Sequence, residues 1–434
     1  MAKPKLALIP AAQGSKFYSV LPSDGVGDFD FTRGSKATRI NAQGLIEIVN
    51  DNISRLDYDL LNGKVVNCPH YLLEPARTNL LKYSEDFSGT GLSNWTASGA
   101  SFTTPLQVSP DGSLNAWKLT EDSTNGLHQA NYPTLAASAS TYYTASFFVK
   151  ANGRNFFQIL GSTGSEGGGY VNFDIVNGIV GSSEHLTGQI EDYGNGWFRC
   201  SGTNISTSTA TEIRLYPFFI TALNSQRAES YQGDGSSGYY IFGAQIEEGS
   251  YPTSYIPTNG TTITRTAETA TGSGDAATFN DSEGVLMANF SSFADSTFKY
   301  ITISDGSIEN RITIILLSNN NIYGQVRAAN SEVFFQETSG ISIQHNNKIA
   351  VSYKTNQCKL FVNGFQVGST DTSSPMPSGL NTLAFDDGSG SNDFYGKTRE
   401  LQYFYSVLTD AQLETLTSWT SLQEMITSQL YTNY

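Results

Sequence analysis

The feature that most constrains the fold is a succession of short segments in which apolar and polar residues alternate, each bounded by Gly, Asn, Asp or Ser. In TYYTASFFVK (residues 141–150), every second residue from Tyr143 to Val149 is apolar. That is the period of a β-strand with one buried face. Similar segments follow at regular intervals in two runs, residues 76–257 and 278–434. The pattern predicts an all-β protein with two tandem antiparallel β-sandwiches of the jelly-roll type.

Other patterns connect and precede these runs. Residues 1–75 hold too little apolar material for a core of their own, so we expect an extended N-terminal docking segment that packs on another body. Its clearest strand is residues 45–49. Residues 258–277 are rich in Thr, Gly, Ser and Ala without bulky periodic residues, which is typical of a linker. In the second run, Asn363-Gly364 between two apolar segments predicts a tight β-hairpin.

The chain changes period near its end. Thr409 and Gln412 form a capping-box pair of the Thr-x-x-Gln type. Apolar residues then recur at helical spacing, at Leu413, Leu416, Trp419, Leu422, Ile426 and Leu430. This pattern predicts a short C-terminal helix whose apolar stripe packs on its own domain or in a homo-oligomer.

The charge balance limits the partners. The chain has 25 Lys and Arg against 40 Asp and Glu, a formal net charge of -15. Such a surface repels phosphate backbones and anionic lipids, so we expect neither nucleic acid as a partner nor membrane insertion. Cys68, Cys200 and Cys358 are far apart and odd in number, which indicates free thiols rather than a disulfide framework. The apolar stretch at the N-terminus is broken by Pro10 and is too short for a signal peptide.

Three groups of motifs resemble known families. GDFDFTRGSKATRINAQGLIEIVNDNISRLDYD and LLEPARTNLLKYSEDFS resemble a segment common in virion proteins of tailed bacteriophages, mainly tail-fibre, spike and baseplate chains. YYTASFFVKANG, DYGNGWFRCSGT and FGAQIEEGSYPTSYIPT resemble the carbohydrate-binding-module jelly rolls that follow that segment in phage proteins. KIAVSYKTNQCKLFVNGFQVGST and FYGKTRELQYFYSVLTDAQLETL are similar to concanavalin A-like lectin and laminin-G domains.

The resemblance implies a non-enzymatic bacteriophage virion structural protein or adhesin. Such a protein is made in the host cytoplasm without a signal peptide and is localised in the virion. Its implied partners are other virion proteins and a host-surface polysaccharide or glycan, and by analogy with phage fibres it is a homo-oligomer, a trimer in the usual case. One alternative is a purely structural capsid or baseplate decoration protein that binds only virion proteins. A glycan depolymerase is the less favoured alternative.

The sequence offers no constellation for catalysis. His70, His128, His185 and His345 are far apart, and no metal-binding spacing, nucleophile elbow or phosphate-binding loop is present. Glycoside hydrolysis needs two carboxylates that converge on one bond. The adjacent pairs Glu191-Asp192 and Glu247-Glu248 would point to opposite faces of a strand. We therefore expect a protein without enzymatic activity.

Sugar binding requires fewer groups than catalysis does. An exposed aromatic ring and a few polar side chains beside it are enough. The candidates are Trp95, Tyr193 and Trp197 in the first sandwich and Asn392 and Tyr395 in the second. Trp95 lies in the polar stretch SGTGLSNWTASG and is the tryptophan we most expect to be exposed. Trp197 begins a predicted strand, where packing is the commoner role, and Trp117 alternates as in a core strand.

One loop gathers carboxylates. Asp386, Asp387 and Asp393 lie within DDGSGSNDFY, and lectin-type sandwiches sometimes hold Ca²⁺ in such loops through oxygen ligands. The spacing differs from that of an EF-hand, and a solvated turn is the alternative interpretation. Apart from a structural calcium ion at these residues, we expect no cofactor.

Overall fold

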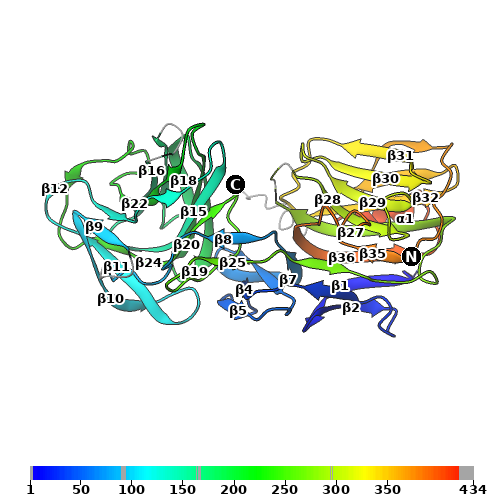
Figure 1. Ribbon diagram of the computed structural model, residues 1–434, viewed down its shortest axis with the longest axis horizontal. Coiled ribbons are helices and arrows are strands. Elements are labelled where there is room, and N and C mark those ends of the chain that lie inside the picture. Colours follow the sequence, from blue (N-terminus) through cyan, green and yellow to red (C-terminus); the bar gives the residue numbers. More distant parts are fainter. Residues whose placement is uncertain are drawn as a thin grey trace.

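The computed structural model describes residues 3–88, 94–162, 164, 168–293, 295 and 297–419. Strands make up most of the chain, and they form two sandwiches that lie side by side (Figure 1). The predicted all-β fold with two antiparallel sandwiches is confirmed.

The first sandwich consists of two six-stranded sheets. One contains, in order, β10 (Ala100–Val108), β11 (Leu114–Glu121), β24 (Gly238–Glu248), β15 (Tyr142–Asn152), β20 (Trp197–Ile205) and β19 (Thr187–Gly194). The other contains β18 (Ile179–Glu184), β17 (Tyr170–Asp174), β16 (Phe156–Gly161), β22 (Leu215–Phe219), β13 (Gln129–Asn131) and β9 (Thr96–Ser98). Two short pairs complete it, β12 (Asn125–Gly126) with β23 (Tyr231–Gln232) and β14 (Leu135–Ala136) with β21 (Glu212–Ile213).

The alternation in β15 sets the core of this sandwich. Its alternate residues from Tyr143 to Val149 are buried against the facing sheet, as the sequence predicts. Phe148 points the other way and is buried as well, in a second cluster with Ile46 and Trp197. Both faces of this strand are therefore covered, one by the sandwich core and the other by the N-terminal segment.

The second sandwich has one large and one small sheet. The large, 11-stranded sheet follows the order β26 (Thr269–Thr271), β3 (Phe29–Thr32), β2 (Lys16–Leu21), β1 (Leu6–Gln13), β36 (Gly396–Phe404), β27 (Glu283–Ser292), β32 (Asn347–Lys354), β33 (Cys358–Val362) and β34 (Phe365–Asp371). In addition, β7 (Lys64–Leu73) pairs with β36 and with β6 (Leu56–Leu61). The small sheet contains β31 (Ser331–Thr338), β30 (Ile322–Ala328), β29 (Arg311–Leu316), β28 (Lys299–Ser304) and β35 (Thr382–Ala384).

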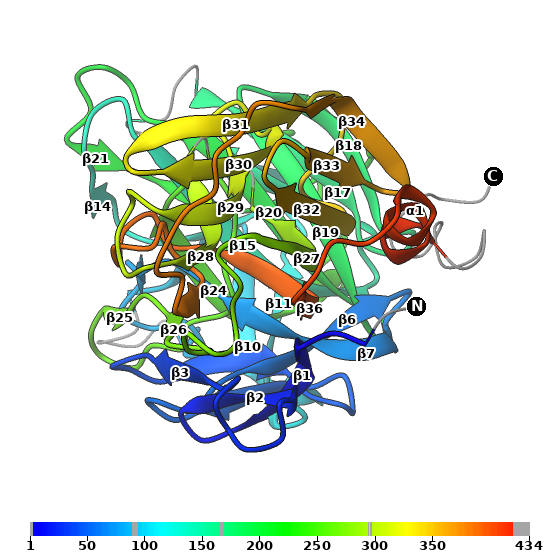
Figure 2. The same cartoon turned by 90° about the vertical axis from the view of Figure 1, so that its right-hand side faces the viewer.

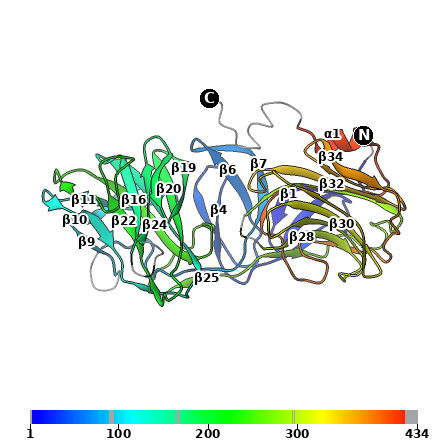
Figure 3. The same cartoon turned by 90° about the horizontal axis from the view of Figure 1, so that it is seen from above.

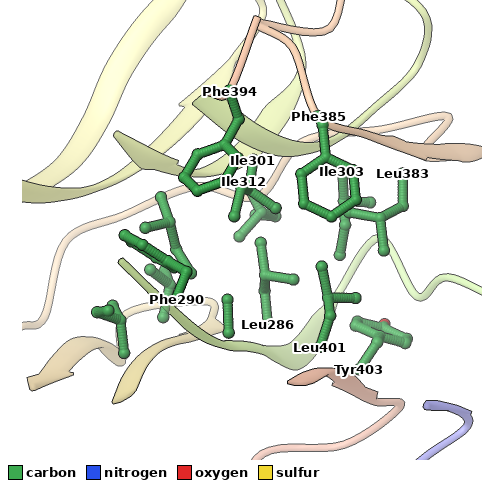
Figure 4. Packing of buried hydrophobic residues seen from close by; sticks show 14 of the residues in the cluster. Leu286, Phe290, Ile301, Ile303, Ile312, Leu383, Phe385, Phe394, Leu401 and Tyr403 are labelled. Atoms are coloured by element: carbon green, nitrogen blue, oxygen red, sulfur yellow. The ribbon is translucent and has the colours of Figure 1, made fainter. Parts of the chain in front are cut away.

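Branched aliphatic and aromatic side chains fill the space between these two sheets. Ile301, Ile303 and Ile312 of the small sheet point toward Leu286 and Leu401 of the large one (Figure 4). Phe385 and Phe394 come from the loop region after β35 and close the same core. All of these residues are buried.

The first 75 residues are divided between the two sandwiches. Strands β1, β2 and β3 extend the large sheet of the second sandwich (Figure 2). The hairpin of β4 (Ala37–Ile40) and β5 (Ile46–Val49) lies in the middle of the molecule, where Ile46 packs on Phe148 and Trp197 of the first sandwich (Figure 3). The segment thus packs on both bodies rather than on one.

The segment predicted to be a linker, residues 258–277, contains paired strands instead. Strand β25 (Ile263–Arg265) pairs with β8 (Arg77–Asn79), and β26 pairs with β3. Because these strands are only three residues long and rich in Thr, they carry no apolar periodicity that a sequence pattern could detect. The segment between the two runs is thus tied to the N-terminal segment by short strand pairs, which the sequence pattern did not predict.

A buried ion-pair cluster joins this segment to the N-terminal one. Arg33 and Arg55 contact Glu268, and Arg55 and Arg265 contact Glu74. Their side chains are at most 2% exposed. Three of the five residues lie in the phage-like motifs, in FTRGS, ISRLD and LLEPA. These three motif residues therefore have a structural role, because their ion pairs join the N-terminal segment to residues 258–277.

The C-terminal helix is shorter than its sequence pattern. Helix α1 (Asp410–Thr417) begins at the predicted capping box, with Thr409 and Gln412 bonded reciprocally. Leu413 and Leu416 are buried on the large sheet of the second sandwich. Leu422, Ile426 and Leu430 lie outside the described residues. Over the part of the chain that the structure describes, no helix is long and apolar enough to cross a membrane.

Candidate functional site

A cleft lies where the two sandwiches and the N-terminal segment meet. It encloses about 610 Å³, a volume within the range of small-molecule sites. Its walls come from β4 and β6 of the N-terminal segment, from β19 and β20 of the first sandwich, and from β36 and residues 344–346 of the second.

Charged side chains from the N-terminal segment and the second sandwich line one wall. Asp59 of β6 accepts a 2.9 Å hydrogen bond from Lys397 Nζ and a second bond from Arg399, both on β36. Arg399 also donates to the Asn346 side chain. Burial alone would raise the pKa of Asp59, but the charges of Lys397, His70 and Arg399 outweigh it and hold that pKa well below its ordinary value.

His70 lies behind this wall. The ring is fully buried, with Nε2 3.1 Å from Asp57 Oδ2 and Nδ1 3.8 Å from Asp59 Oδ2. Burial lowers the pKa of His70, although both carboxylates favour the charged form. The buried imidazole therefore lies between two aspartates whose charges oppose the effect of its burial.

The opposite wall belongs to the first sandwich. Tyr193 packs edge-on against Phe148 with ring centroids 4.8 Å apart, and burial raises the pKa of its hydroxyl. Arg199 donates to Ser146 Oγ and to the Thr253 carbonyl, and its Nε has no partner among the described residues. Glu191 lines the same wall and is exposed.

Two turns meet beside the cleft, at the smaller neighbouring cavity. Gly63, between β6 and β7, lies so near Gly194 that a Cβ on Gly63 would be 2.2 Å from the Gly194 Cα. Both residues have positive φ, +67° and +78°, so glycine is required there for conformation as well as for space. Beside this contact is a smaller cavity of about 280 Å³, which Tyr193 and Trp197 both line.

The cleft is rich in groups that can bind a ligand, and its Asp59 is unsuited to act as a general acid. A carboxyl group that acts as general acid must be protonated near neutral pH, and Asp59 is held ionised by two cations. The cleft also presents amides, hydroxyls and a tyrosine, including Gln344, Asn346, Ser254 and Tyr193. Such groups can bind a ligand that carries several hydroxyls.

The aromatic residues predicted to bind sugar differ in their exposure and position. Tyr193 lies in the cleft wall. Trp95 is only 1% exposed, packs on Phe87 and Tyr132, and donates from Nε1 to the Tyr83 carbonyl. The prediction that Trp95 is exposed is wrong, because its ring fills space in the core of the first sandwich and its indole N–H has a backbone acceptor.

Trp197 is also buried, at 2% exposure, and its Nε1 donates to the Val108 carbonyl at 2.9 Å. Trp197, at the start of β20, therefore packs on Ile46. Packing is the commoner role for a tryptophan in that position. Trp117 is half-buried at the edge of the first core, as its alternation predicts.

The acidic loop of the second sandwich is not part of the cleft. Asp387 accepts hydrogen bonds from Ser389 and from Asn392 within the loop, and these hold its pKa low despite burial. Burial raises the pKa of Asp386 and of Asp393, which accepts a bond from the Tyr395 hydroxyl. Among the described residues, no three His, Cys, Asp or Glu side chains are grouped so as to hold a metal ion. The calcium site stays a prediction.

One sheet face of the first sandwich is closed to ligands by the chain itself. Residues 221–230 lie across the outer face of β16 and β17. Asn172 donates to the Ser225 carbonyl at 2.7 Å, and Gln158 donates to the Gln226 carbonyl at 3.2 Å. Both amides are fully buried, so the groups that could bind sugar hydroxyls there are used by the protein.

The sequence contains a signal for the cleft that lies outside the motifs named above. Asp57 and Asp59 are two residues apart on one strand, and Lys397 and Arg399 are two apart on another. Residues at this spacing share a face of a strand, so the pattern marks two charged strand faces of opposite sign. Only the pairing of β7 with β36 brings them together.

No family model and no curated protein matches this sequence. Among solved structures, it is similar to the CBM40 domain of the Ruminococcus gnavus IT-sialidase (15% identity, 34% of this chain and 88% of that chain, TM-score 0.30). It is also similar to the tandem CBM22 domains of Paenibacillus barcinonensis Xyn10C (10% identity, 76% and 98%, TM-score 0.24) and to domains LG4-5 of the mouse laminin α1 chain (9% identity, 65% and 86%, TM-score 0.23). These scores are low, and the fold rests on the strand order described above.

Proposed function

We propose that this protein is a non-enzymatic glycan-binding component of a bacteriophage virion, with the cleft as its glycan site. The observation that supports this most directly is the cleft itself, where amide, hydroxyl, charged and tyrosine side chains from three parts of the chain converge. Its partner in this proposal is a polysaccharide or glycan on the host surface. A single such site binds weakly, and many copies on one particle would raise the avidity.

The test uses the full-length protein on a glycan array and on whole host cells. Gln344→Ala and Glu191→Gln change exposed side chains of the cleft without removing a buried ion pair. Both variants should lose at least part of the binding, while Glu309→Gln, an exposed carboxylate that does not line the cleft, should bind as the wild type does. Equal binding by all three variants would contradict the cleft as the glycan site.

The second candidate is a decoration protein that binds only other virion proteins. It is favoured by apolar side chains on the N-terminal strands, since Ile9 and Val20 are 50% and 47% exposed. In that case the wild-type protein would bind no glycan or cell. Ile9→Ser with Val20→Ser would abolish its co-sedimentation with phage particles, and Gln344→Ala would not.

A further inference from the structure

We propose that the outer face of the small sheet of the second sandwich is a separate carbohydrate site, which takes a pyranose unit of a neutral glycan. This site shares only its class of ligand with the proposed function and is independent of the cleft. The site is built around the ring pair of Tyr323 on β30 and Phe335 on β31. Neither residue lines the cleft.

The strand register places a defined set of side chains on this face. Ile301, Ile303 and Ile312 point into the core (Figure 4), so the residues that alternate with them point outward. One row across the sheet runs Tyr300, Ile315, Tyr323, and the next runs Thr302, Thr313, Gln325, Phe335. On this face Phe335 is exposed and Tyr300 and Tyr323 are half-buried, and the hydroxyls of Thr302 and Thr313 and the amide of Gln325 lie buried beside them.

The aromatic part is open to solvent. The Phe335 side chain is 53% exposed, and its ring is nearly parallel to that of Tyr323, with centroids 5.4 Å apart and an angle of 14°. Tyr300 lies two strands from Tyr323, about 9–10 Å away at the usual strand spacing. Rings arranged in this way offer apolar area to the C–H face of a sugar ring.

Polar groups lie directly beside the rings. Glu332 accepts from the Tyr323 hydroxyl at 3.2 Å and from the Gln325 amide. Arg311 donates to Gln325 Oε1 at 3.1 Å. The acidic Glu332 and Glu337 balance Arg311 and Arg327 on this face, which favours an uncharged ligand over an anionic one.

Buried hydrogen-bonding groups on this face lack partners. Thr302 Oγ1, Thr313 Oγ1 and Arg311 Nε have none among the described residues, and all three residues are at least nine-tenths buried. Thr313 lies directly opposite Gln325, and Thr302 opposite Thr313. Buried polar groups are normally satisfied, and a ligand hydroxyl that enters at the Arg311–Gln325 bond would provide the missing partner.

The experiment measures retardation of the full-length protein in gels that contain a soluble neutral polysaccharide, using β-glucan, xylan and mannan in turn. Phe335→Ala should raise the dissociation constant for the retarding polysaccharide about tenfold. Phe365→Ala, which removes an aromatic ring that is 76% exposed on β34 of the other sheet, should leave it unchanged. Thermal unfolding of both variants checks that they are folded.

The outcomes separate this site from the cleft. Loss of retardation in Phe335→Ala but not in Gln344→Ala supports the sheet face and contradicts the cleft. Loss only in Gln344→Ala overturns the present inference and leaves the proposed function intact. Wild-type protein that none of the polysaccharides retards, or a Phe335→Ala variant whose only change is weaker self-association in sedimentation, also overturns the inference.

Discussion

Arg55 donates a 2.9 Å hydrogen bond to Oε2 of Glu74, and both side chains are withdrawn from water. Arg55 also contacts Glu268, from the strand-forming segment between the sandwiches. This guanidinium therefore joins parts of the chain more than 200 residues apart in the sequence, since its separation from Glu268 is 213 residues.

The first prediction concerns this cluster. Arg55→Ala removes a fully buried guanidinium that bonds both Glu74 and Glu268, and each carboxylate keeps one other arginine, so we expect the free energy of unfolding to fall by about 3–5 kcal/mol. Arg39→Ala is the matched control, because it removes the 3.0 Å ion pair with Glu47 at the surface, which should cost about 0–1 kcal/mol. Urea denaturation measures both. Equal losses of unfolding free energy in the two variants would show that the buried cluster does not stabilise the contact between the N-terminal segment and residues 258–277.

The second prediction concerns acid stability. Burial alone would raise the pKa of Glu74, but Arg265 and Arg55 hold it well below its ordinary value, and Asp59 is likewise shifted down. A carboxyl whose pKa is lower in the folded protein stabilises it above the unfolded pKa, about 4, and this contribution is lost as the pH falls below that value. The melting temperature should therefore drop steeply below about pH 4.

Asp59→Asn provides the control for acid stability. The variant lacks one of the shifted carboxyls, so its melting temperature should be lower at neutral pH and should depend less on pH in the acid range. A pH dependence identical to that of the wild type would mean that Asp59 does not contribute.

The third prediction concerns Trp95. Its ring lies 4.9 Å from that of Phe87 and 5.0 Å from that of Tyr132 in the first core. Trp95→Ala should lower the free energy of unfolding by about 3–5 kcal/mol through the cavity it leaves. Leu114→Ala removes an exposed apolar side chain and should change it by less than about 0.5 kcal/mol. A Trp95→Ala variant as stable as the wild type would contradict the core role.

The fourth prediction concerns metal removal. The Asp387 carboxylate is already engaged by Ser389 and Asn392, so the loop is closed by its own hydrogen bonds. EDTA should therefore leave the melting temperature unchanged. If calcium raises it, and Asp393→Asn removes that effect, the calcium site predicted at Asp386, Asp387 and Asp393 is real.

Local patterns were enough to predict many strands of the two sandwiches and the Asn363-Gly364 turn. The alternation in β15 gave its buried face, and Asn363-Gly364 indeed forms the two-residue turn between β33 and β34, with φ of +51° and +90°. Both features depend only on residues close in sequence, where side-chain period and turn chemistry decide the conformation.

Long-range pairing could not be predicted from such patterns. The cleft depends on the pairing of β36 with β7, and the sequence of neither strand indicates which strand it pairs with. Trp95 shows the converse, since its polar neighbours favour exposure, but the space beside Phe87 and Tyr132 accommodates a large ring. Burial of a single side chain is decided by what packs against it from elsewhere in the chain.

The pairing of β1 with β36 has a consequence for synthesis. Leu6 of β1 lies opposite Tyr403 of β36. One edge of β1 therefore stays unpaired until β36 has been synthesised. The first sandwich, by contrast, has all the strands of its two sheets between residues 96 and 248. A nascent chain that ends before β36 therefore contains every strand of the first sandwich's two sheets but lacks the strand that pairs with Leu6–Leu8.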